Sequence, residues 1–281
     1  MPVCKSWMKY GWEGGHCEIP AWEHDPEDLC ILHSLQPHKN KSLFDQTLKE
    51  KLGRHDFDFR GIFFPGPVSF VQQAFHYAAR FQNAQFGGWA DFRQAEFAAE
   101  ADFSQTTFAQ AANFTQTKFR GPARFGQTAV LGEADFQEAA FAAEALFQGI
   151  NASSQAPFRA SFQSIHFEVG GRLQFQDLSL EQVSFLGSDM RRVAFHNVRW
   201  PLWHGRQVVF DELLLHKKDS RGLSAAASRP AYGLKAGDVC AHLEQLYRYL
   251  KLNYEQEGDQ KQAGDFHYGE MDMHRRADAW R

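Results

Sequence analysis

Phenylalanine recurs along the middle of the chain at alternating steps of five and six residues, and a small residue lies two positions before most of them. The stretch from 81 to 103 reads FQNAQFGGWADFRQAEFAAEADF, and polar residues fill the positions between the apolar ones. The repeating unit is F-x-x-A-x-F-x-x-x-A-D, eleven residues long. The phenylalanines that we expect to point inward are Phe81, Phe86, Phe92, Phe97, Phe103, Phe108, Phe114, Phe119, Phe125, Phe136, Phe141 and Phe147.

This spacing distinguishes a helix from a strand. On an α-helix, at about 100° per residue, Phe81, Ala84 and Phe86 would point to about 0°, 300° and 140°. They would not form the single apolar stripe that an amphipathic helix needs. In a strand, residues two apart share one face. Each small-x-Phe triplet therefore predicts a very short strand, and four such sides make a square coil of about 20–22 residues.

The repeated A-[DN]-F-x-x pattern resembles the pentapeptide repeat family, and the similarity covers roughly residues 57–210. Members of this family form right-handed quadrilateral β-helices. The resemblance therefore implies a mainly β solenoid of about seven coils, with α-helices only toward the ends of the chain. Two stretches interrupt the rhythm: NASSQAP (151–157) lacks its expected phenylalanine, and EVGGRLQ (168–174) is too long for one side and predicts a surface loop.

Two units per coil would place residues 22 apart on neighbouring strands, about 4.8 Å from each other. Like charges directly opposite one another destabilise a sheet, and this register avoids them. The expected structural ladders are Arg80–Asp102–Arg124 and Asp91–Asn113–Asp135.

We expect four segments along the chain: an N-terminal module (1–56), the β-helix (57–213), a linker (214–237) and a C-terminal helical pair (238–281). A short helix over 42–52 would begin with Ser42 as its cap and cover the N-terminal end of the solenoid. In the helical pair, we expect Phe266, Met271 and His274 on the inner face of the second helix.

The N-terminal module contains a candidate metal site. Cys4, Cys17, Cys30 and His33 have the spacing C-x12-C-x12-C-x2-H, and structural zinc prefers four such thiolate and imidazole ligands. A metal would staple a segment that has little apolar material for a core of its own. The arrangement is similar to small N-terminal Cys/His modules in some pentapeptide-repeat proteins, which implies one structural zinc. The other interpretation is three free thiols and an exposed histidine.

Composition limits the partners and the location. The chain has 30 Lys and Arg against 34 Asp and Glu, a formal net charge of −4, which does not indicate nucleic acid or an anionic membrane as a direct partner. The N-terminus lacks an apolar signal-peptide core, and there is no run of about 18 apolar residues to span a bilayer. Four cysteines without a secretory signal fit a reducing compartment, so we expect a cytoplasmic protein.

We find no nucleophile elbow, phosphate-binding loop or dinucleotide fingerprint, and we expect the protein not to be an enzyme. His166 and His196 flank core positions, so strand alternation predicts that they point outward. Asp211 and Glu212 follow the repeats and could pair as acids, which is weak support for catalysis. Cys240 lies on the apolar side of a predicted helix and is expected in its core.

The leading functional interpretation is a scaffold that binds an unidentified protein partner, with an end module that could join copies of the chain. Some pentapeptide-repeat proteins mimic B-form DNA and inhibit a type II topoisomerase, which is the first alternative. Residues 57–200 carry 13 acidic and 11 basic residues, far from the charge of a duplex.

The C-terminal segment resembles a tetratricopeptide-type helical pair, except at Lys251 and Glu270. It also resembles a segment that leads toward membrane helices in longer family members, so a soluble regulatory domain of a membrane-associated protein is the second alternative.

Overall fold

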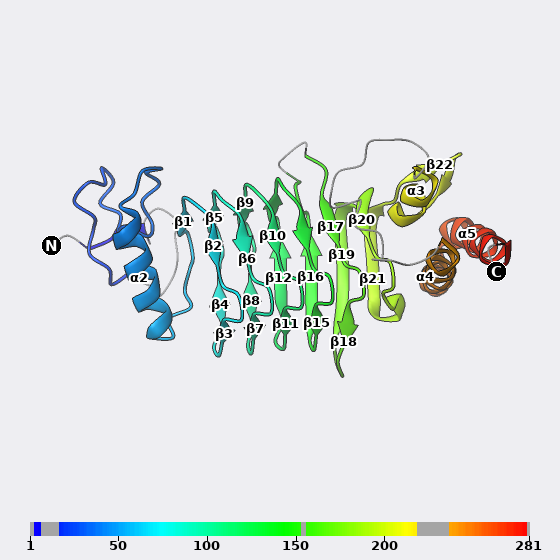
Figure 1. Ribbon diagram of the computed structural model, residues 1–281, viewed down its shortest axis with the longest axis horizontal. Coiled ribbons are helices and arrows are strands. Elements are labelled where there is room, and N and C mark those ends of the chain that lie inside the picture. The colour runs from blue at the N-terminus through cyan, green and yellow to red at the C-terminus, as the bar shows by residue number, and fades with distance from the viewer. Residues whose placement is uncertain (1–2, 7–16, 153–155, 218–235, 280–281) are drawn as a thin grey trace.

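The structure is a computed structural model that describes residues 3–6, 17–152, 156–217 and 236–279. Its central body is a parallel β-solenoid with four narrow sheets, placed between an N-terminal module and a group of C-terminal helices (Figure 1). The predicted fold class, a mainly β solenoid with helices at the ends, is confirmed. Two of the four sheets contain six strands each, which corresponds to about six turns.

Most strands are only two residues long, as small-x-Phe triplets require. The first sheet contains β1 (Phe63–Phe64), β5 (Gln85–Phe86), β9 (Thr107–Phe108) and β13 (Ala129–Val130). The second contains β2 (Val68–Ser69), β6 (Ala90–Asp91), β10 (Ala112–Asn113), β14 (Ala134–Asp135), β17 (Arg159–Ser161) and β20 (Gln182–Ser184). The third contains β3 (Ala74–Phe75), β7 (Glu96–Phe97), β11 (Lys118–Phe119), β15 (Ala140–Phe141) and β18 (His166–Phe167). The fourth contains β4 (Ala79–Arg80), β8 (Ala101–Asp102), β12 (Ala123–Gly126), β16 (Glu144–Gln148), β19 (Arg172–Ser179) and β21 (Val193–Arg199).

The coils have a register of 22 residues until the repeat is interrupted. Ala90 pairs with Ala112, and Ala112 pairs with Ala134. Beyond β14 the loops at the two irregular stretches lengthen the coil, so that Phe147 pairs with Phe175. The strict five-residue spacing then shortens it, and Leu173 pairs with Val193. Residues 153–155 of the first irregular stretch lie outside the described residues.

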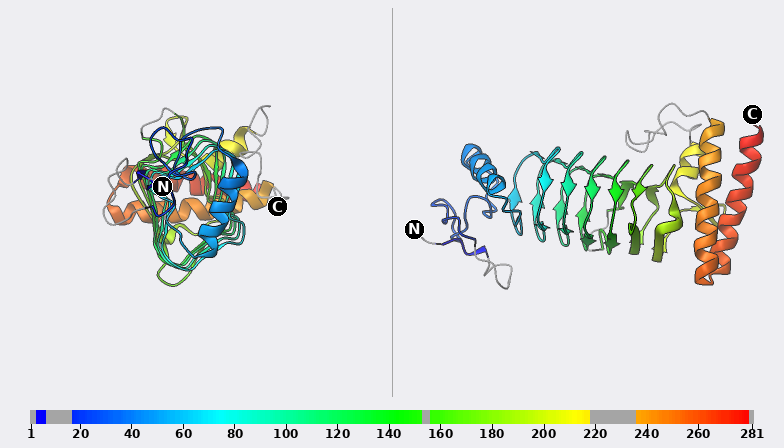
Figure 2. Two further views of the ribbon diagram at one scale, coloured as in Figure 1. Left: turned by 90° about the vertical axis from the view of Figure 1, so that its left-hand side faces the viewer. Right: turned by 90° about the horizontal axis from the view of Figure 1, so that it is seen from below.

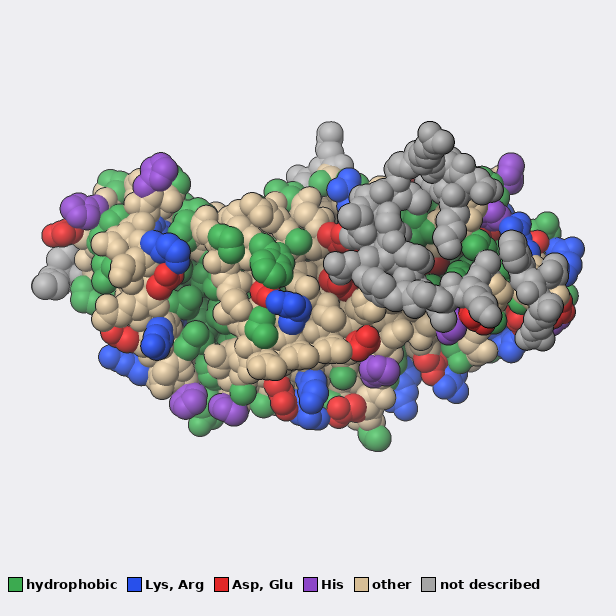
Figure 3. All heavy atoms as spheres, in the orientation of Figure 1, with side chains coloured by type: hydrophobic (Ala, Val, Ile, Leu, Met, Phe, Trp, Pro, Cys, Tyr) green, Lys and Arg blue, Asp and Glu red, His purple; other side chains and the backbone are tan. Residues whose placement is uncertain are grey.

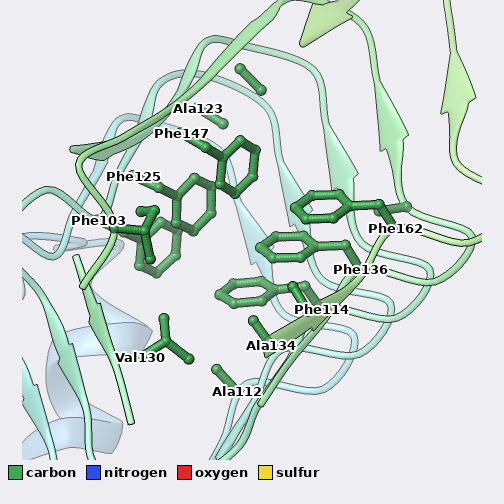
Figure 4. Close-up of a cluster of buried hydrophobic side chains, with 14 of the residues drawn as sticks. Phe103, Ala112, Phe114, Ala123, Phe125, Val130, Ala134, Phe136, Phe147 and Phe162 are labelled. Atoms are coloured by element: carbon green, nitrogen blue, oxygen red, sulfur yellow. The ribbon is translucent and has the colours of Figure 1, made fainter. Parts of the chain in front are cut away.

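The interior is filled by columns of stacked phenylalanine rings. In one column the ring centroids of Phe114 and Phe136 are 4.7 Å apart with nearly parallel planes, and so are those of Phe136 and Phe162 (Figure 4). Rings of adjacent columns meet edge to face: Phe125 and Phe136 are 5.4 Å apart at 87°. Offset and edge-to-face pairs are the favourable aromatic geometries. Alanine, which lies two residues before most of these rings, leaves the backbone room to bend round this narrow core.

The polar residue between the alanine and the phenylalanine shapes the corner that follows. The side chains of Asp91, Asp102 and Asn113 each accept a hydrogen bond from the backbone N–H two residues ahead. These are Asx turns, in which a side chain takes the place of a backbone acceptor. The next residue then takes a positive φ near 58°. The residues with this conformation recur eleven apart, at Gln72, Asn83, Gln94, Gln105, Gln116, Gln127 and Glu138.

Helix α2 (Lys41–Gly53) lies across the N-terminal end of the solenoid (Figure 2). Its buried Phe44 meets the ring of Phe64 edge to face at 5.9 Å. The expected Ser42 cap is wrong: the side chain of Asn40 accepts the hydrogen bond of the Leu43 amide. Asn40 precedes the helix with an extended backbone, which is what an N-cap requires.

At the other end lie the hairpin of β22 (Leu202–Trp203) and β23 (Arg206–Gln207), helix α3 (Phe210–Lys217), and the antiparallel pair α4 (Ala236–Glu257) and α5 (Gln260–Ala279). The pair crosses the C-terminal end of the solenoid (Figure 2). Met273, not Met271 or His274, is buried in α5, because it lies two turns from Phe266. Residues 218–235 of the expected linker lie outside the described residues. No helix in the described ranges is long and apolar enough to cross a membrane.

Candidate metal centre

Four sulfur and nitrogen ligands meet in the N-terminal module. The ligand atoms of Cys4, Cys17, Cys30 and His33 all lie within 4.8 Å of one another. Cys30 and His33 share one turn, closed by a 2.8 Å hydrogen bond from the Ser34 amide to the Cys30 carbonyl. Cys4 and Cys17 come from either side of the undescribed segment 7–16. The structure thus brings together the four side chains that the sequence proposed as ligands.

Two of the distances between these atoms match a tetrahedral metal site. Sγ of Cys17 and Sγ of Cys30 are 3.7 Å apart, and Sγ of Cys4 is 3.6 Å from Nδ1 of His33. Zinc, with Zn–S of about 2.3 Å and Zn–N of about 2.0 Å, would separate its ligand atoms by roughly 3.5–3.8 Å. A disulfide needs about 2.05 Å between sulfurs, so these cysteines are thiols.

The backbone of the first coil orients the histidine. Nε2 of His33 lies 2.9 Å from the carbonyl oxygen of Arg60. Because a carbonyl only accepts, Nε2 carries the proton and Nδ1 presents its lone pair to the sulfurs, with the nearest sulfur, that of Cys30, 3.1 Å away. Metal-binding histidines are commonly held by such an outer hydrogen bond. The same contact occupies a carbonyl at the open edge of the solenoid.

Lys39 is a second tie between the module and the first coil. Its buried ammonium donates to the carbonyls of Leu32 and Phe63, each at 2.8 Å, and lies over the rings of Phe44 and Phe63. The Phe63 amide also donates to the Leu32 carbonyl, at 3.1 Å. Burial lowers the pKa of Lys39 to about 7. The residues beside His33 therefore continue the hydrogen bonding of β1, and the centre and the edge of the solenoid form one unit.

The three thiols cannot all ionise easily without a cation between them. Hydrogen bonds from the Cys17 and Cys30 thiols lower the pKa of Cys4. The pKa of Cys17 is raised to about 12: the Cys30 hydrogen bond lowers it, but the bond to Cys4, burial and the Cys4 charge outweigh that effect. Hydrogen bonds to Cys17 and Cys4, followed by burial, raise the pKa of Cys30. A divalent cation would remove this repulsion and let all three sulfurs bind as thiolates.

The expected charge ladders have their residues in register but do not pair with each other. Asp102 lies between Arg80 and Arg124. Its carboxylate accepts from the Gln82 amide at 2.6 Å, while Nε of Arg124 contacts Glu100 at 2.8 Å. The Asx turn keeps the Asp102 carboxylate close to its own backbone. The longer Gln82 side chain therefore bonds to it, and Arg124 pairs with Glu100 instead. Asp91, Asn113 and Asp135 are likewise in register.

A ladder of glutamine side chains at one corner was not anticipated. The amides of Gln72, Gln94 and Gln116 each donate along the solenoid axis, and the last donates to Glu138 at 2.8 Å. The signal was present, because glutamine or glutamate recurs at this corner every 22 residues.

The acid pair after the repeats is a structural junction. Asp211 accepts from the Ser184 hydroxyl and, at 2.9 Å, from the Phe185 amide. Glu212 accepts from Arg206 at 2.6 Å and from the Tyr247 hydroxyl. The two carboxylates therefore bind α3 to the last coil and to α4, and do not face one another. His166 and His196 are exposed and Cys240 is buried, as predicted.

The C-terminal pair is joined to the solenoid by buried polar contacts. The indole N–H of Trp200 donates to the Tyr254 hydroxyl at 2.8 Å. Lys251 and Glu270, which replace the small residues usual in a tetratricopeptide pair, form an ion pair at 3.3 Å. This ion pair joins α4 to α5, and the two helices together close the end of the solenoid.

Three comparisons with known proteins bear on identity. A family model described as pentapeptide repeats (9 copies) matches residues 103–151. A search of curated proteins and a search of solved structures found no match. The matched residues include β9 through β16 and lie within the region that the sequence pattern singled out.

Proposed function

Because the middle of this chain is a pentapeptide-repeat β-solenoid with a separate module at each end, we propose that the protein is a non-enzymatic scaffold that binds another protein. The observation that supports this best is the interior, which stacked phenylalanine rings fill. A small cavity inside the solenoid is lined by apolar groups such as Phe108, Val130 and Ile150, together with Thr128. The Thr128 hydroxyl is already bonded to the Phe103 carbonyl. This cavity presents no reactive polar group, so we expect a partner to bind to the outward surface of the solenoid.

Charged side chains are distributed unevenly over the outward surface of the solenoid. Residues 82–89, 104–111 and 126–132, which include β5, β9 and β13, contain no charged side chain, and we refer to them as the uncharged face. Trp89 and Leu131 are exposed there. The corner between the third and fourth sheets instead carries ion pairs such as Glu96–Arg120 and Glu144–Arg172. Depletion of charge with an exposed aromatic is typical of the centre of a protein interface. In Figure 3 charged side chains gather toward the lower edge and the two ends, and the upper middle is mostly uncharged.

The test compares how well three purified proteins capture a partner: the wild type, a double variant of the uncharged face and a control variant. We expect Trp89→Ser with Leu131→Ser to lower partner affinity by about tenfold or more, as removal of an interface anchor does. Val169→Ser is the matched control, because Val169 is also apolar and exposed but lies outside the uncharged face. Equal binding by the double variant would argue against this face, and robust turnover of a substrate would argue against the scaffold.

We infer that the centre holds a structural zinc ion, with Cys4, Cys17 and Cys30 as thiolates and His33 through Nδ1. Bound zinc would supply structure rather than chemistry, because four protein ligands leave no open position. Elemental analysis tests this. The wild type should carry stoichiometric zinc, Cys17→Ser and Cys30→Ser should lose most of it, and Cys240→Ala, a buried thiol in α4, should retain it. Equal metal content in all four proteins would refute the site.

The DNA-mimic alternative has less support. Several carboxylates along the solenoid are neutralised by arginines, as in Glu100–Arg124 and in the bidentate contact of Arg93 with Asp91. A duplex presents a continuous row of unpaired negative charge. Inhibition of gyrase supercoiling at micromolar protein would restore this alternative.

A further inference from the structure

The four ligands of the metal centre differ in their access to solvent. Cys4 and Cys30 are fully buried and His33 is nearly so, whereas Cys17 is partly exposed. Sγ of Cys17 lies 3.7 Å from Sγ of Cys30. A small oxidant would therefore reach one thiolate first and find a second thiolate within reach of it. Reactive thiols are those that are both ionised and accessible.

We propose that the metal centre is a peroxide-sensitive clasp, in which oxidation joins Cys17 to Cys30 and releases the metal together with the edge of the first coil. This proposal rests on the zinc site inferred above and assigns its regulation. The oxidant it names is hydrogen peroxide, a two-electron acceptor.

The chemistry balances in two steps. The Cys17 thiolate attacks one peroxide oxygen, breaks the O–O bond and forms a sulfenic acid, while the departing hydroxide takes a proton to become water. The Cys30 thiolate then attacks the Cys17 sulfur, forms the S–S bond and expels a second hydroxide, which is also protonated. Two thiolates, one peroxide and two protons thus give one disulfide and two waters. Cys4 and His33 alone are too few ligands for tight zinc binding.

Release of the metal would alter the end of the solenoid through His33. The distance between the two sulfurs must shrink from 3.7 Å to about 2.05 Å, which pulls residue 30 and its turn toward residue 17. His33 lies on the same turn and donates to the Arg60 carbonyl, and the adjacent Leu32 carbonyl accepts from Phe63. Both contacts cap the first coil, so an uncapped edge is the expected structural consequence.

The experiment treats zinc-loaded full-length protein with stoichiometric peroxide and follows two readouts. Released zinc is measured with a chromogenic chelator, and disulfides are mapped by mass spectrometry of non-reduced peptides. We expect zinc release to match formation of a Cys17–Cys30 disulfide, and a thiol reductant with added zinc to restore the starting state. Cys240 in the same samples is an internal control and should oxidise more slowly by about tenfold or more, because it is buried.

The readouts separate this proposal from the zinc site itself. Absence of zinc before peroxide is added would overturn the site. Zinc present at the start but retained after oxidation, a disulfide through Cys4 instead, or sulfinic acid at Cys17 without a disulfide would each overturn the clasp. Cys4→Ser keeps both reacting sulfurs and should still form the disulfide. If that variant does not fold, the wild-type peptide map alone decides.

Discussion

At the scale of single residues, polar side chains form hydrogen bonds with the backbone at two positions where the repeat departs from its ideal. Thr117, in the place of alanine, donates its hydroxyl to the Phe92 carbonyl at 2.8 Å. Asn151 follows the last strand of the first sheet, and its amide both accepts from the Val130 N–H and donates to the Val130 carbonyl. A single side chain thus completes the edge of β13 where the next strand is missing. The sequence showed only that a phenylalanine was absent there.

This role of Asn151 leads to a prediction with a nearly isosteric change. In Asn151→Asp, an ionised carboxylate can still accept from the Val130 amide but cannot donate to its carbonyl. We expect a loss of about 1–3 kcal/mol in the free energy of unfolding at neutral pH, measured by urea denaturation. Asn83→Asp, at a half-buried turn that has the same positive φ of 58°, is the control and should have a much smaller effect. Equal effects of the two changes would contradict the account.

Asp211 gives the protein a predictable pH dependence. Burial raises its pKa to about 6, above its ordinary value of 3.8. The folded state therefore holds this proton more tightly than the unfolded state, and the stability from Asp211 is present at low pH and lost between about pH 4 and pH 6. The amide introduced by Asp211→Asn cannot titrate. The free energy of unfolding of this variant minus that of the wild type should thus rise by about 2 kcal/mol from pH 4 to pH 8. Urea denaturation at both pH values measures this, and a constant difference would show that the carboxyl is not buried as described.

At the scale of elements, the sequence predicted α2, α4 and α5 but not α3, which begins inside the expected β-helix and ends inside the expected linker. The ends of the predicted helices and one buried face were also not specified correctly. The 3.6-residue period located α4 and α5, because their apolar stripes are long and regular. Ser42 and Asn40 are both good caps, and only the backbone path selects Asn40. The inner face of α5 was misassigned at Met271, because the turn between the helices sets the phase of the second one.

Two glycines in α5 provide a matched test of how this helix packs. A Cβ at Gly269 would lie 2.8 Å from the Tyr247 ring, whereas a Cβ at Gly264 would have no atom within 4 Å. Gly264→Ala should raise stability by up to about 1 kcal/mol through helix propensity. Gly269→Ala should lower it by about 1–3 kcal/mol, since the ring must move. Thermal unfolding followed by circular dichroism distinguishes them, and two stabilising changes would mean that α5 does not pack against Tyr247.

At the scale of the whole molecule, the repeat makes the structure of the solenoid predictable from the sequence. It contains no information about the contacts between the ends of the solenoid and the two modules. Eleven-residue periodicity specifies the 22-residue register, because every coil must place the same side chains inward. The metal centre joins ligands from three segments, and spacings of twelve residues contain no geometric information about how those segments meet. The role of Lys39 could not be predicted from the sequence either, because lysine side chains are usually exposed. Only the structure shows that Lys39 is buried and has two carbonyl partners.

The central claim is that the N-terminal centre clasps the first coil of a linear scaffold in which each coil contacts only its neighbours. Hydrogen exchange of the zinc-loaded and chelator-treated protein tests it most directly. We predict that removal of zinc lowers protection of the Phe63 amide, which donates to the Leu32 carbonyl, while the Gly87 amide, which donates to the Phe64 carbonyl, changes much less. Protection of residues 90–141 should stay as it was. Unchanged protection at Phe63, or a uniform loss along the whole solenoid, would contradict the account.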